Sequence, residues 1–65
     1  MNVVLNQQPL QLPANATVQD LLAAIDARPP FAVAVNTGFV PKAQYATWAL
    51  HEGDQIEVIA PVTGG

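Results

Sequence analysis

Short hydrophobic blocks separated by polar turns run along this chain, and their spacing predicts strands at both ends with one helix between them. Asn2–Asn6 predicts a first strand, and Pro9–Leu12 predicts a second that returns beside it after the turn at Asn6–Gln8. Because Pro9 has no N–H to donate to a neighbouring strand, we expect the second strand to lie at a sheet edge or to begin at that residue. The first part of the chain therefore predicts a β-hairpin.

A helix is predicted after this hairpin. Thr17 stands where an N-cap hydroxyl would accept a backbone N–H, and Asp20 follows three residues later, close to the pattern of a capping box. Pro29–Pro30 must end the helix, because a proline disfavours the helical conformation in the residue before it. Apolar residues at positions i, i+3, i+4 and i+7 predict the face that packs in the core: Val18, Leu21, Leu22 and Ile25.

The second half of the chain predicts further strands. Phe31–Val35 is a continuous apolar run that favours a well-buried strand, and the turn residues Asn36–Gly38 separate it from a brief strand at Phe39–Val40. Pro41–Ala46 predicts one short helical turn with proline at its first position. Asp54–Ile59 predicts the final strand.

The side chains present exclude several function classes. The 65 residues make one small domain, without cysteine for disulfides or thiolate catalysis and without serine as a nucleophile. His51 is the single histidine, so it has no second histidine for a metal pair, and we interpret it as a surface residue. Tyr45 and Trp48 are interpreted as aromatics that close one end of a small core.

Charge and hydropathy argue against nucleic acid and membrane as partners of this chain. Lys42 and Arg28 are the only basic residues against five acids, and a net charge of −3 argues against a nucleic-acid surface. The apolar runs are far shorter than a membrane span, and the N-terminus lacks the charged start and long apolar stretch of a signal peptide. We therefore expect a cytoplasmic protein that binds neither nucleic acid nor membrane. We also expect it to be a monomer when free.

The chain ends on two glycines, and residues 60–63 lie between them and the last predicted strand. A glycine carboxyl has no side chain beside the acyl carbon, so a nucleophile or a nucleotide phosphate can approach it, although a terminus without a role is the alternative. As an ionised carboxylate this end would react only after another protein had activated it. Pro61 has no N–H and should end the strand ladder, so we expect residues 61–65 to form a mobile tail. The tail residues predicted to enter a partner's site are Val62, Thr63, Gly64 and Gly65.

Strand alternation predicts a second partner-binding element. If Val3 and Leu5 point toward the helix, Val4 points away from it, because successive strand side chains alternate. The same alternation in the last strand places Ile59 on the outer side. We expect Val4 and Ile59 to contribute to an apolar platform beside the tail that docks a partner.

The order hairpin, helix, strand, short strand and final strand gives an α+β domain, in which a mixed sheet of four to five strands packs on one α-helix. Its length, order and diglycine end resemble the ubiquitin-like β-grasp fold and, more narrowly, the ThiS/MoaD family of sulfur carriers, over essentially all of residues 1–65. Thr37, Lys42 and Tyr45 stand where the ThiS family often has glycine, arginine and tryptophan, which leaves open any contact that needs an arginine. The segments that carry the resemblance are Thr17–Leu22, Ala32–Asn36, Val40–Lys42, Glu52–Val58 and Val62–Gly65.

The resemblance implies a function in thiamine biosynthesis. In the ThiS family an E1-like adenylyltransferase (ThiF-like) uses ATP to adenylate the terminal glycine, here Gly65. A sulfur relay fed by a cysteine desulfurase then converts the acyl adenylate to a thiocarboxylate, and thiazole synthase (ThiG-like) receives the sulfur. The chain itself would bind no cofactor, and it would be a carrier and substrate of its partners rather than an enzyme.

Three alternatives share this fold or this ending. A molybdopterin sulfur carrier has the same fold and diglycine chemistry, but its chains usually run somewhat longer. A ubiquitin-like modifier, or a carrier for another sulfur pathway, would join the terminal glycine to a lysine or serve a different acceptor. A non-catalytic β-grasp interaction module with an accidental diglycine is the third.

Overall fold

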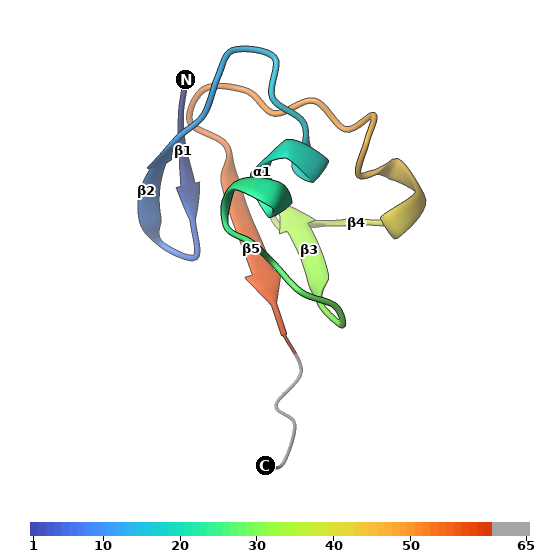
Figure 1. Cartoon of the computed structure of the whole chain (residues 1–65). Helices are drawn as coiled ribbons and strands as arrows, with labels where there is room; N and C mark the ends of the chain where they lie inside the picture. The colour runs from blue at the N-terminus through green and yellow to red at the C-terminus, as the bar shows by residue number, and fades with distance from the viewer. Residues whose placement is uncertain (61–65) are drawn as a thin grey trace.

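The structure is a computed structural model that describes residues 1–60. Its strands form one mixed sheet in the order β2-β1-β5-β3-β4, and α1 covers one face of it (Figure 1). The predicted order of elements is therefore confirmed over the described residues. The elements are β1 (Asn2–Leu5), β2 (Gln8–Gln11), α1 (Val18–Ala24), β3 (Ala32–Val35), β4 (Gly38–Val40), a 3₁₀ turn (Lys42–Gln44) and β5 (Gln55–Ile59).

The predicted hairpin forms from β1 and β2, and β2 is an edge strand as its proline requires. The loop between them is Asn6 and Gln7, with φ angles of 48° and 68°. Two positive φ angles in a two-residue loop match the right-handed twist of the flanking strands. Asparagine tolerates this conformation through its short polar side chain, so the turn forms without glycine.

The second hairpin, between β3 and β4, repeats this geometry at Asn36 and Thr37, with φ angles of 50° and 70°. The apolar run that forms β3 is buried on one face only. Val33 is 1% exposed on the inner side, whereas Ala32 is exposed on the outer side. The prediction of a well-buried strand is wrong for that outer side, because α1 covers only the other face.

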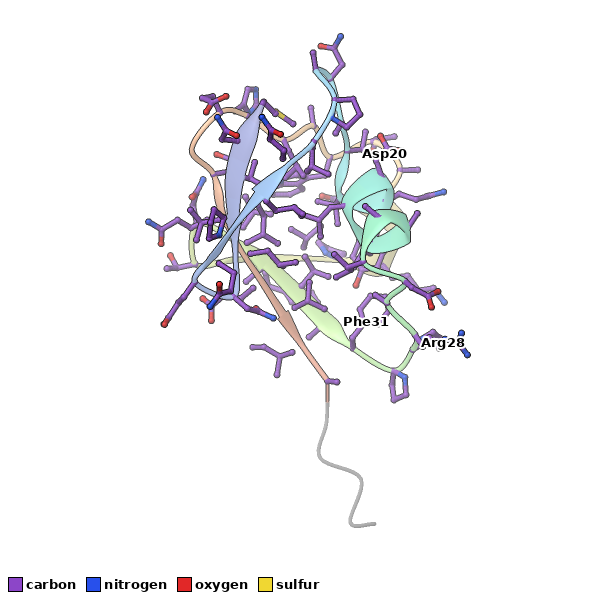
Figure 2. The ribbon with its side chains drawn as sticks, turned by 60° about the vertical axis from the view of Figure 1, so that its left-hand side comes forward. Asp20, Arg28 and Phe31 are labelled. Atoms are coloured by element: carbon purple, nitrogen blue, oxygen red, sulfur yellow. The ribbon has the colours of Figure 1, made fainter. Side chains whose placement is uncertain are left out.

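Helix α1 begins with the predicted capping box. The N–H of Thr17 donates to Asp20 Oδ2 at 2.9 Å, and the N–H of Asp20 donates to Thr17 Oγ1 at 3.3 Å. Asp20 lies at the first turn, on the solvent side of the helix (Figure 2). The two hydrogen bonds satisfy N–H groups that have no partner within the helix.

The helix ends earlier than the prolines require. Asp26 has a φ angle of 54°, its N–H donates to the carbonyl of Ala23 at 3.2 Å, and the N–H of Ala27 donates to that of Leu22 at 3.0 Å. This pair of hydrogen bonds is a Schellman motif, which ends a helix at a left-handed residue. The link to β3 then carries Arg28 outward, away from the domain, and Phe31 to the start of β3 (Figure 2).

One core lies between α1 and the inner face of the sheet. The predicted helix face is buried at Val18, Leu21 and Leu22, and Ile25 packs against it partly exposed. Tyr45 and Trp48 also pack at its edge, and the ring of Tyr45 stacks on that of Phe31 with centroids 6.0 Å apart. The buried core residues are Val3, Leu12, Ala16, Val18, Leu21, Leu22, Val33, Val35, Val40, Leu50 and Ile56.

Candidate functional site

The central strand β5 is the element that leads to the predicted reactive end. It lies between β1 and β3 and ends at Ile59, where the chain leaves the sheet (Figure 1). The predicted tail residues Val62, Thr63, Gly64 and Gly65 lie outside the described residues, and so does the expectation that residues 61–65 are mobile. The described part of the site is thus the end of β5 and the sheet surface beside it.

The two neighbours of β5 support it over different lengths. Strand β3 runs antiparallel to it and pairs as far as Ala32 with Ile59. Strand β1 runs parallel to it, but the pairing ends at Leu5 with Ile56 because β1 then turns into the hairpin. The last residues of β5 therefore have a neighbouring strand on one side only.

The side chain of Asn6 occupies the other side. Its Oδ1 accepts the N–H of Val58 at 3.0 Å, and its Nδ2 donates to the Val58 carbonyl at 3.2 Å. From the sequence, Asn6 was expected only to end a strand and to begin a turn. An asparagine that both ends a strand and opens a two-residue turn was the available signal, because such a residue projects its amide beside the next strand of the sheet.

The structure does not bring the two predicted platform residues together. Val4 is partly buried and pairs with Gln55, whereas Ile59 lies four residues further along β5 and is 58% exposed. At about 3.3 Å per residue, that separation is roughly 13 Å along the strand. Both side chains belong to the outer face of the sheet, but they do not form one contiguous platform.

Further apolar side chains lie on the outer face on the β3 side of Ile59, and the largest of them was not predicted from the sequence. Phe39 on β4 is 67% exposed and pairs with Ala34, whose other partner is Glu57. Paired residues point to the same face, so these side chains share the outer face. We call the apolar members the outer patch: Ala32, Ala34, Phe39 and Ile59. The available signal was alternation, because a buried Val40 places Phe39 outward.

The polar groups at the start of β5 form structural contacts. The carboxylate of Asp54 accepts the N–H of His51 at 2.8 Å and the Nδ2–H of Asn36 at 3.0 Å, which closes the turn before β5. The imidazole of His51 is on the surface, with 80% of its side chain exposed, as predicted. Among residues 1–60, no three His, Asp or Glu side chains are grouped to hold a metal ion. Over the same residues, no helix has the length and apolar character of a membrane span.

A single helix on a five-stranded mixed sheet, with the central strand leading to the C-terminus, defines a ubiquitin-like β-grasp domain. The comparison with known proteins narrows this class. The sequence model of the ThiS family matches residues 3–65, and the chain belongs to that family.

The relatives agree with this family. The Escherichia coli (strain K12) sulfur carrier protein ThiS is 36% identical, over the full length of both chains. The chain is also 37% identical to part of a thiazole synthase from Paramagnetospirillum magneticum, of which it covers 20%. The crystal structure of the Geobacter metallireducens thiamine biosynthesis protein ThiS superposes with a TM-score of 0.85 at 22% identity, with both chains fully covered. The solution structure of a thiamine biosynthesis protein from Geobacter metallireducens superposes with a TM-score of 0.82 at 22% identity, with all of this chain and 88% of that chain covered.

Proposed function

We propose that this sulfur carrier of the ThiS family carries sulfur on the main-chain carboxyl of Gly65. An E1-like adenylyltransferase would join that carboxylate to the α-phosphate of ATP and release pyrophosphate. A persulfide of a relay fed by a cysteine desulfurase would then attack the acyl carbon and displace AMP, which gives an acyl disulfide. A second thiol of the relay would reduce that S–S bond, which leaves the thiocarboxylate and a disulfide on the relay. The chain supplies the carboxyl and the shape that partners recognise, and the partners supply ATP and the catalytic groups.

The family match across the diglycine end is the observation that carries this proposal, because it extends to residue 65. It also favours the thiamine pathway over the molybdopterin one, since the full-length relative is a ThiS sulfur carrier. The composition suits a carrier, because sulfur bound at the main-chain carboxyl needs no cysteine thiol and the sequence has no cysteine. Activation of a carboxylate by adenylation makes a poor electrophile reactive without any side-chain nucleophile.

A thiazole synthase is the proposed acceptor of the sulfur. The support is the Paramagnetospirillum magneticum thiazole synthase, which contains a segment 37% identical to this whole chain. A carrier segment joined to a synthase keeps the two at high effective concentration, which is useful when one delivers its cargo to the other.

The test is the position of the reactive carboxyl. Deleting Gly65, or adding one residue after it, should abolish ATP–pyrophosphate exchange by the adenylating partner, because the carboxylate would lie short of or beyond the α-phosphate. Gly64→Ala should be milder but still harmful, because it adds a Cβ to a segment that must pass a narrow channel. Intact mass after incubation with ATP, the partner and a sulfur source should show replacement of one oxygen by sulfur.

Thermal melts provide the control for these variants. Among residues 1–60 the buried core runs from Val3 to Ile56, and we expect changes at Gly64 or Gly65 to leave the melting curve nearly unchanged. Exchange at the wild-type level by the Gly65 deletion would show that the terminus is not the reactive group, and the carrier chemistry proposed for Gly65 would be wrong.

A further inference from the structure

Two asparagines open the two tight turns of the sheet, and both reach β5 with their side chains. Asn6 and Asn36 have nearly equal φ angles, 48° and 50°. Asn36 acts at the start of β5, where its Oδ1 accepts the N–H of Gln55 at 2.9 Å. Asn6 acts near the other end, at Val58. The pair offers the same residue type and the same backbone conformation at opposite ends of one strand.

The carboxamide of Asn6 continues the hydrogen-bond ladder after β1 has turned away. The backbone N–H of Asn6 donates to the carbonyl of Ile56 at 2.9 Å, which is the last backbone contact between these segments. Val58 is the next β5 residue that faces β1, because backbone groups alternate sides along a strand. A side-chain amide offers one donor and one acceptor in the same arrangement as a peptide group, so it substitutes for the missing strand residue.

Val58 consequently has a neighbour on both sides, although its N–H and its carbonyl both face β1. On the β3 side it pairs with Val33, and on the β1 side it meets the amide of Asn6. The next residue, Ile59, pairs only with Ala32. Val58 is thus the last described residue of β5 whose backbone is hydrogen-bonded on the β1 side, and it lies one residue before the end of the strand.

We propose that Asn6 is a positioning residue that holds the end of β5 in place and thereby presents the C-terminal segment to the adenylating partner. The inference rests on the proposed function of Gly65 as the reactive end. Val58 and Ile59 precede the C-terminal segment. When these two residues are already ordered in the free protein, binding does not have to order them, and the affinity for the partner is higher. Without the amide, the cost of ordering falls on the binding step, so KM rises while kcat is retained.

Glycine substitutions separate this effect from a change in the turn. Asn6→Gly removes the amide but accepts the left-handed backbone, and Asn36→Gly is the matched control at the start of β5. Hydrogen exchange in the free protein should show the Val58 amide about tenfold less protected in Asn6→Gly, as expected for the loss of two hydrogen bonds. In Asn36→Gly the loss should fall on Gln55 instead. Unchanged protection of Val58 in Asn6→Gly would show that the carboxamide of Asn6 does not hold Val58, and the proposal would be wrong.

Kinetics with the adenylating partner test whether loss of the Asn6 amide raises KM. ATP–pyrophosphate exchange should show KM for Asn6→Gly raised by roughly tenfold with kcat nearly unchanged. Asn36→Gly, at a comparable melting temperature, should keep the wild-type KM. Loss of protection at Val58 with a wild-type KM would overturn the positioning role. If wild-type carrier itself supports no exchange, the proposed function of Gly65 fails, and the hydrogen-exchange result still decides whether Asn6 holds Val58.

Asn6→Asp provides a pH-dependent check. An ionised aspartate accepts the Val58 N–H but places its second oxygen against the Val58 carbonyl. A protonated carboxyl again has one donor and one acceptor, as the amide does. Protection of Val58 relative to Asn36→Asp should therefore recover as the pH falls toward about 4, where an ordinary aspartate protonates. If protection of the Val58 amide in Asn6→Asp is the same at neutral pH and at about pH 4, the Nδ2–H donor of Asn6 has no role.

Discussion

At the scale of single residues, this chain builds its turns from polar residues in the left-handed region rather than from glycine. Asparagine and aspartate reach this region at moderate cost, because their short side chains form local hydrogen bonds. Gly53 is the one glycine among residues 1–60 with a positive φ, at 82°. The other described residues with positive φ are Asn6, Gln7, Asn15, Asp26, Asn36 and Thr37.

Asp26 gives a direct test of this use of the left-handed region. Asp26→Val should destabilise the domain by about 1–2 kcal/mol, because a β-branched side chain is crowded at a φ of 54°. Asp26→Gly should remain within about 0.5 kcal/mol of wild type, since glycine is the usual residue at this helix position. Both variants lose the exposed ion pair with Arg28, so their difference isolates the backbone. Equal stabilities in denaturant melts would contradict the Schellman assignment.

At the scale of elements, α1 depends on its packing. Seven residues are too few for an isolated helix to be stable in water, even with a capping box. Val18 and Leu21 are fully buried against the sheet, and Leu22 is 7% exposed beside them. The helix therefore forms together with the core.

Leu22→Ala measures this dependence. We expect a loss of about 2–5 kcal/mol in the free energy of unfolding, from lost burial and from the cavity left behind. Gln19→Ala, at an exposed position in the same helix, is the control and should change stability by less than about 0.5 kcal/mol. Denaturant melts of both variants give the comparison. A loss below about 0.5 kcal/mol for Leu22→Ala would mean that this helix face does not carry the core.

The elements were predictable because each has a local signal. Helical periodicity and Thr17 with Asp20 located α1, and proline located the edge strand β2. The end of α1 was not predictable from Pro29–Pro30, because an aspartate ends the helix before the prolines are reached. The outer side of β3 was also missed, since an apolar run does not reveal whether a second layer covers the sheet.

At the scale of the whole molecule, the described site depends on strand order. Phe39 and Ile59 are distant in sequence and share a patch only because β3 pairs with both β4 and β5. Alternation predicted correctly that Ile59 faces outward. It did not give the register between strands, which separates Val4 from Ile59 and brings Asn6 to Val58.

The outer patch gives the last prediction, which is that a partner docks on it. Ile59→Asp and Phe39→Asp should each weaken binding to the adenylating partner by roughly tenfold or more, because each places a charge at the centre of an apolar contact. Both side chains are more than half exposed, so the domain should still unfold cooperatively. Gln11→Asp adds the same charge on the edge strand β2, away from the patch, and should bind normally. Val4→Asp tests the other predicted platform residue, and its separation from Ile59 predicts a smaller effect on affinity. Titration calorimetry with the purified partner measures all four, and unchanged affinity for both patch variants would exclude the outer patch as the docking surface.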